Sequence, residues 1–144
     1  MGRVVVHAHG VPKEKSLKHL IEMYGKRLQS RGVRVEYHPA KESAEAYINR
    51  LLNLGGELWL LDEGGEQLDS VAFADRYEAW QLSNQTVHLA LGPAEGWANG
   101  PEHAALPRCS LSSMTFPHEL AAVMLMEQLY RASEIQRGTG YHKA

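Results

Sequence analysis

The sequence has a single cysteine and no long apolar run. Because Cys109 is the only cysteine among 144 residues, no internal disulfide can form, and we expect this thiol to be a small buried side chain in a reducing compartment. No stretch reaches the roughly 18 consecutive apolar residues of a membrane span, and the start of the chain lacks the apolar segment of a secretory signal. We therefore expect a cytoplasmic protein that contacts no membrane.

Excess basic charge is also lacking. The formal net charge is -2, which argues against a protein that binds nucleic acid simply by being basic. The average hides an asymmetry, because residues 1–41 hold nine Lys/Arg and three Asp/Glu, whereas residues 42–107 hold two and eleven. The basic segment is either a solvated helix face or a surface that faces phosphates.

Apolar runs and helical periodicity alternate along the whole chain. The runs predict strands at residues 3–8, 33–38, 57–61, 86–91 and 108–111, and the turn-rich DEGGEQ ends the third strand. The helical spacing predicts helices at residues 15–30, 43–54, 69–82, 97–106 and 117–137. This alternation predicts one α/β domain over residues 1–144, with a mostly parallel sheet and helices on both faces.

Three loops have the chemistry of a ligand site. In parallel sheets ligands bind beyond the carboxyl ends of the strands, and these loops follow Leu61, Leu91 and Leu111. The loop GPAEG (residues 92–96) has two glycines that permit close backbone approach, although an ordinary turn would look the same. The segment SLSSMTFPHE (residues 110–119) brings hydroxyls and free backbone donors to a helix start, where either a polar ligand or simple helix capping would use them.

The last helix and the tail suggest a partner. Apolar residues cover more than one narrow stripe of residues 117–137, which fits either sheet packing plus a second subunit or a purely internal core role. The tail combines the ring of Tyr141, the titratable group of His142 and the cation of Lys143.

Histidine is frequent, with eight residues, but we expect no metal site. His7 and His9 would lie on one face of a strand, yet no companions stand at metal-site spacing in the sequence. His118 and His142 are better candidates for function. The remaining four are expected to be surface or structural residues: His19, His38, His88 and His103.

Several linked motifs together resemble the RlmH family of SPOUT-class methyltransferases, which modify a pseudouridine of large-subunit ribosomal RNA. The matching residues are Leu61/Asp62, the GxxEG pattern of Gly92, Glu95 and Gly96, SLSxMT at 110–115, Pro117/His118, Glu127, LYRA at 129–132 and Tyr141/His142. The resemblance implies a C-terminal trefoil knot, a homodimer, S-adenosyl-L-methionine as cofactor, and methylation at N3 of a pseudouridine in 23S rRNA of the assembled ribosome.

The resemblance also implies the site residues. Tyr141, His142 and Lys143 would act on the target nucleotide, His142 by assisting proton removal or orienting the base, and Lys143 by holding phosphate or an oxyanion. The cofactor would contact Leu61, Gly92, Glu95, Gly96, Leu111, Ser112, Ser113, Met114, Thr115 and Phe116.

Two positions depart from the family pattern. Pro93 replaces a glycine and so removes a backbone donor, and Lys143 replaces a common arginine and so loses a bidentate contact. Two alternatives therefore stay open: a SPOUT enzyme that acts on another RNA such as tRNA, and a homodimer that binds cofactor or ribosome without catalysis.

Overall fold

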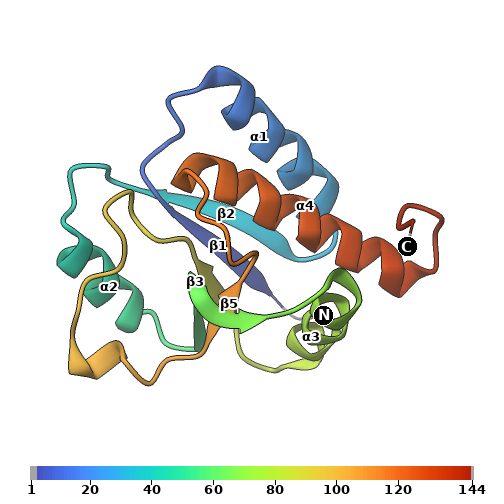
Figure 1. Ribbon diagram of the computed structural model, residues 1–144. Coiled ribbons are helices and arrows are strands. Elements are labelled where there is room, and N and C mark those ends of the chain that lie inside the picture. Colours follow the sequence, from blue (N-terminus) through green and yellow to red (C-terminus); the bar gives the residue numbers. More distant parts are fainter. Residues whose placement is uncertain (1–2, 144) are drawn as a thin grey trace.

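A five-stranded parallel sheet forms the centre of the protein, in a computed structural model that describes residues 3–143 (Figure 1). The strand order is β2-β1-β4-β3-β5, and every neighbouring pair runs parallel. The strands are β1 Val4–His9, β2 Val33–His38, β3 Glu57–Gln67, β4 Val87–Ala90 and β5 Arg108–Ser110. The helices are α1 Lys15–Gln29, α2 Ala44–Leu52, α3 Ser70–Leu82, α4 His118–Arg137 and the short 3-10 helix η1 Pro101–His103.

Helices cover both faces of the sheet, as the alternating sequence predicts. Helices α1, α3 and α4 share one apolar core with residues of β1 and β4, such as Val6 and Leu89. Helix α2 lies on the other face, where Tyr47, Ile48 and Leu51 pack on Leu60 of β3. Figure 1 shows α1 and α4 side by side, with α2 well apart from them. The α/β fold class is thus confirmed. The expected knot remains a prediction.

The third strand is longer than predicted. The DEGGEQ segment does not end β3 at Leu61 but continues it to Gln67, with a register shift against β5 between Leu61 and Glu66. Glycine allows this passage, because a Cβ on Gly65 would lie 2.8 Å from the backbone carbon of Arg108. The turn prediction was wrong because paired glycines can also form a bulge that lets two strands approach closely.

The prediction of a helix at residues 97–106 is also wrong in extent. Only the single 3-10 turn Pro101–His103 forms, and the rest of this segment is loop. Gly100 and Pro101 interrupt helical hydrogen bonding, while the His103 ring bonds to the carbonyl oxygen of Ala98 at 2.6 Å. The segment therefore remains free to line the end of the sheet.

Three histidines form a hydrogen-bonded row across β2, β1 and β4. The His7 ring lies 2.8 Å from His38 through Nδ1 and 2.8 Å from His88 through Nε2, and all three are buried. The sequence offers His7 no companions at metal-site spacing, but the fold brings companions to it from neighbouring strands. The pairing of β1 with β2 places His7 opposite Glu36 and thereby brings the row together.

None of the helices within residues 3–143 combines the length and apolar character needed to cross a membrane.

Cys109 is buried, as expected, and we predict that it resists alkylation in the folded chain. Burial raises the pKa of its thiol to about 11, so the thiolate fraction at pH 8 is about one in a thousand. Iodoacetamide at pH 8, followed by mass spectrometry, should label the native chain at least about 100-fold more slowly than the urea-unfolded chain. Equal labelling rates would show that Cys109 is reachable in the native state.

Candidate functional site

A cavity of about 420 Å³ lies at the carboxyl ends of β4 and β5, beside residues Leu61, Asp62 and Glu63 of β3. The segments that follow Leu61, Leu91 and Leu111, which the sequence predicts as loops, all contribute to it, although the first of them continues β3. Parallel pairing of β3 with β4 and β5 brings the three segments together. The volume falls within the usual range of small-molecule sites.

Eight of the ten residues expected to contact a cofactor line the cavity. They are Leu61, Gly92, Gly96, Leu111, Ser112, Met114, Thr115 and Phe116. The other two, Glu95 and Ser113, are exposed and are not among the lining residues. Glu95 lies in a turn closed by the Gly96 N–H, which donates to the carbonyl oxygen of Pro93 at 2.9 Å. The turn directs Glu95 away from the wall that its neighbours form.

Two aromatic side chains hold the cavity walls in place, and sequence analysis assigned them no role at the site. The Tyr47 hydroxyl of α2 donates to the carbonyl oxygen of Leu91 at 2.8 Å, and the Trp97 indole donates to that of Leu61 at 2.8 Å. Their rings stack nearly parallel, with centroids 5.6 Å apart. The position of Trp97 directly after GPAEG was the available signal, whereas Tyr47 comes close only through the fold.

The GPAEG loop fits tightly against Trp97. A Cβ at position 92 would lie 3.1 Å from the indole nitrogen, so glycine allows the loop to approach the ring. Gly96 has a φ of 88°, in the left-handed region that favours glycine. Pro93 is buried and accepts the turn hydrogen bond through its carbonyl, so its missing N–H is compatible with this loop conformation.

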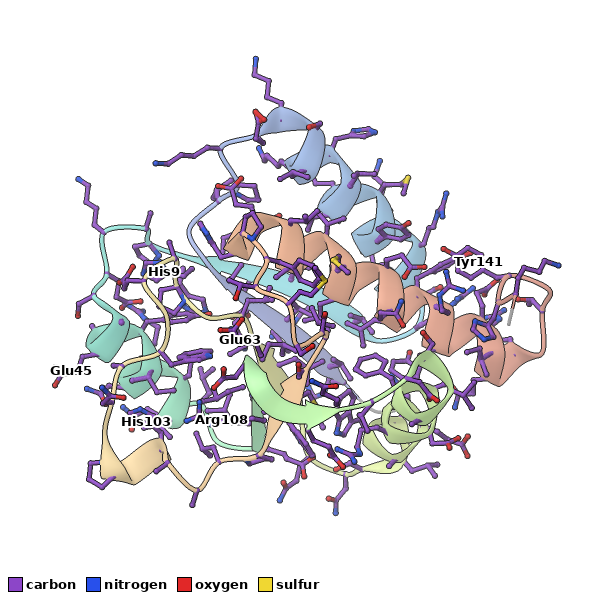
Figure 2. All side chains as sticks on the ribbon, viewed as in Figure 1. His9, Glu45, Glu63, His103, Arg108 and Tyr141 are labelled. Carbon is purple, nitrogen blue, oxygen red and sulfur yellow. The ribbon has the colours of Figure 1, made fainter. Side chains whose placement is uncertain are left out.

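The cavity combines polar and apolar surfaces. Arg108 donates to Asp62 at 2.7 Å, and the Thr115 hydroxyl donates to the Glu63 carboxylate. Met114 is 70% exposed at the rim. Figure 2 shows Glu63 near the centre of the view, with Arg108 below it. Such a site suits a ligand with both a polar and an apolar part.

The tail residues lie elsewhere in the same chain. Tyr141 contacts Tyr130 and Glu127 of α4, whereas the cavity reaches α4 only at His118 and Ala121. Ala121 is six helical residues before Glu127, which is about 9 Å along the helix at 1.5 Å per residue. In Figure 2 Tyr141 lies far from Glu63 and Arg108. A single chain therefore keeps the predicted catalytic residues away from the cavity.

Two residues of α4 order the tail. The Tyr141 hydroxyl donates to Glu127 Oε2 at 2.9 Å, and Arg131 Nη1 donates to His142 Nδ1 at 3.0 Å. Burial and the hydrogen bond to Glu127 raise the pKa of Tyr141, so this phenol stays protonated at neutral pH. Because arginine can only donate, His142 Nδ1 accepts, and in neutral His142 the proton is on Nε2. The Lys143 side chain is exposed.

Part of the basic segment is used inside the molecule. Arg31 forms an ion pair with Glu134 at 2.8 Å, and Arg27 lies over the Tyr130 ring. Arg27 belongs to α1, and Tyr130 also contacts Tyr141 edge-on, with centroids 4.9 Å apart. The carboxyl end of α1 thus brings positive charge next to the tail, while Lys15 and Lys18 at its start are exposed.

Comparison with known proteins gives consistent similarities. A family model described as "Predicted SPOUT methyltransferase" matches residues 3–142. The Ribosomal RNA large subunit methyltransferase H of Synechococcus sp. (strain CC9605) is 43% identical over 86% of this chain and 85% of its own length. The protein of the same name from Synechococcus sp. (strain RCC307) is 38% identical over 99% of this chain and 95% of its own length. The crystal structure of TrmJ from Z. mobilis ZM4 resembles this chain with a TM-score of 0.47 at 7% identity, covering 100% of this chain and 72% of that chain.

We predict that Tyr47→Phe destabilises the cavity wall. The substitution leaves the buried carbonyl oxygen of Leu91 without the Tyr47 hydroxyl and should lower the free energy of unfolding by about 1–2 kcal/mol. Urea denaturation followed by Trp fluorescence measures the change. Tyr37→Phe is the matched control, because within residues 3–143 no hydrogen bond is found for its partly buried hydroxyl. An equal loss of unfolding free energy in both variants would show that the hydrogen bond from Tyr47 to Leu91 does not contribute to stability.

Proposed function

Because this chain belongs to the SPOUT methyltransferase family, we propose that it methylates N3 of a pseudouridine in 23S rRNA of the assembled ribosome, with S-adenosyl-L-methionine as donor. The cavity beside β3, β4 and β5 is the observation that carries the proposal. It gathers residues from three separate motifs that the family resemblance had selected. A ribosomal substrate places the enzyme in the cytoplasm.

The residues present fit the proposed cofactor. A volume of about 420 Å³ is adequate for a nucleoside-sized ligand, and Leu61, Leu111 and Phe116 supply apolar wall. Ser112, Thr115 and the backbone around Gly92 and Gly96 supply polar groups for hydroxyls, amino groups and a carboxylate. The Tyr47 and Trp97 hydrogen bonds keep this surface in shape before the ligand arrives.

The chemistry requires positioning more than covalent help. When bound, the cofactor supplies a methyl carbon on a sulfonium, which is already an activated electrophile. The target N3 must lose its proton to solvent as the N–C bond forms, so the protein has to hold the base in line with that carbon. With Nδ1 accepting from Arg131, His142 presents Nε2–H, which suits orienting a carbonyl of the base rather than taking its proton.

A homodimer reconciles the cavity with the distant tail. Since Tyr141 and His142 lie beside Glu127 and Arg131 of their own chain, they can complete a site only where a second copy brings its cavity to them. Leu120, 36% exposed near the start of α4, and Met114, 70% exposed at the rim, offer apolar surface for such a contact. We propose that each active site combines the cavity of one subunit with the tail of the other.

RNA contact through the tail fits the distribution of charge. Arg131 lies over the Tyr141 ring and Arg27 over the neighbouring Tyr130 ring, although the whole chain is slightly acidic. An aromatic ring beside cations suits an unstacked nucleotide and its phosphates. A small enzyme without excess positive charge would then gain specificity by docking on a large preformed surface, such as the assembled ribosome.

Transfer of labelled methyl groups tests the function. Ribosomes, isolated large subunits and bulk tRNA from a strain lacking the endogenous enzyme are incubated with the chain and labelled S-adenosyl-L-methionine. We expect label on ribosomal RNA of assembled ribosomes. Label on tRNA would instead indicate a SPOUT enzyme with another substrate, and cofactor binding without any label would indicate a binding homodimer.

Variants separate the two halves of the proposed site. His142→Ala and Tyr141→Phe should lower turnover by about 10-fold or more while cofactor affinity stays unchanged, because they touch only the target base. Gly92→Val should abolish cofactor binding, since its side chain collides with Trp97. Calorimetric titration of the cofactor measures affinity, and circular dichroism checks folding. Full turnover in His142→Ala would contradict its proposed role.

Mixing these variants tests whether sites are shared between subunits. After denaturation and joint refolding in equal amounts, about half of the dimers are mixed, and each has one site with both defects and one with neither. Shared sites should therefore restore about a quarter of wild-type activity. If cavity and tail act within one chain, the mixture should be as inactive as the separate Gly92→Val and His142→Ala proteins.

A further inference from the structure

The face of the sheet beside α2 carries a cluster of possible metal ligands that the proposed methyl transfer does not use. His7 of β1 and His38 of β2 face each other with Nδ1 and Nε2 2.8 Å apart. The Glu36 carboxylate lies 3.7 Å from the same His7 nitrogen. One ligand atom from each residue lies within 4.8 Å of the other two, a spacing that a small cation could bridge.

The two imidazoles face each other through ring nitrogens. A neutral imidazole binds a metal through the free lone pair of one ring nitrogen. In the hydrogen bond between His7 and His38, a single proton lies between Nδ1 of one ring and Nε2 of the other. A divalent cation can replace that proton after a small separation of the rings.

His88 supports His7 from behind. His7 Nε2 lies 2.8 Å from His88 Nδ1 on β4, on the side of the ring away from Glu36 and His38. When His7 Nδ1 binds a cation, its Nε2 must carry the proton and can donate it to His88. Metal-bound histidines usually donate their second N–H in this way, which fixes the tautomer and the ring orientation.

The charged groups around the cluster include some that favour and some that oppose the binding of a cation. One oxygen of the Glu36 carboxylate accepts a hydrogen bond from the Arg34 guanidinium, and the other lies on the His7 side. Glu36 therefore lies between the positive charge of Arg34 and the two histidines. Its side chain is 38% exposed on the edge strand β2, which leaves access for the ion and for water. Glu42 and Arg50 lie on the His38 side of the cluster.

We propose that His7, His38 and Glu36 bind one Zn²⁺ per chain, with His88 positioning His7. Two imidazoles and a carboxylate, with room for water as a further ligand, form a donor set that suits zinc among the divalent ions. The zinc ion would link β1 to the edge strand β2, and its ligands are separate from the residues that line the cavity beside β3, β4 and β5. Its ligands come from residues 7, 36 and 38, which explains why sequence spacing gave no metal signal.

Zinc titration of the full chain, treated first with a chelator, tests the proposal by calorimetry. We expect one Zn²⁺ per chain, and Co²⁺ in its place should give the visible absorption bands of a low-coordinate nitrogen and oxygen site. His38→Gln should weaken zinc binding more than about 100-fold, and His88→Leu should weaken it about 10-fold to 100-fold, as expected for an outer partner. Arg34→Gln should strengthen binding several-fold, because it frees the second carboxylate oxygen.

Controls keep the test decisive even if a buried variant fails to fold. Glu36→Gln changes a partly exposed strand residue with little change in volume, and it should weaken binding at least about 10-fold. His19→Ala removes an exposed histidine of α1 and should leave binding unchanged. Absence of stoichiometric binding by the wild type, unchanged affinity in Glu36→Gln, or an equal loss in His19→Ala would each overturn the proposal. None of these measurements depends on methyl transfer.

Discussion

Parallel pairing of β3, β4 and β5 is the constraint on which the rest of the molecule depends. It brings together three segments that lie 20 to 50 residues apart in the sequence, those that follow Leu61, Leu91 and Leu111. Such segments need fixed starting points if they are to form a cavity. Tyr47 and Trp97 provide them by donating hydrogen bonds to two carbonyl oxygens, that of Leu91 just after β4 and that of Leu61 within β3. Helix α2 is therefore part of the site's support, although it contributes no lining residue.

The separation of cavity and tail gives the long helix α4 a second role. The helix begins beside the cavity and carries the tail contacts three turns later, so it holds two functional parts at a fixed distance. Under the proposed function, a site within one chain would require the tail to leave its contacts with Glu127 and Arg131. The helix makes a two-chain site straightforward if copies pack with α4 near their common axis. That the last helix packs on a second subunit as well as inside its own chain stays a prediction.

The two faces of the sheet differ in chemistry. Three helices cover one face with a continuous apolar core, whereas α2 covers only part of the other. That second face also carries the buried row His38, His7 and His88, whose rings hydrogen-bond one another and in which His38 packs edge-on against Tyr47 of α2. Such a row holds neutral rings in the interior, and a bound cation would add a direct link between β1 and β2.

The sequence by itself determined most of the secondary structure, the α/β class and the three loops of the cavity, because hydrophobic periodicity and turn residues are local signals. It also contained the motifs that indicate the family. Only the tertiary structure decided the extension of β3 past Gly65, the anchoring by Tyr47 and Trp97, the distance from cavity to tail, and the histidine row. Each of these depends on contacts between residues far apart in the chain, such as His7 with His88 at a separation of 81. Strand order and register fix such contacts, and no local pattern encodes them.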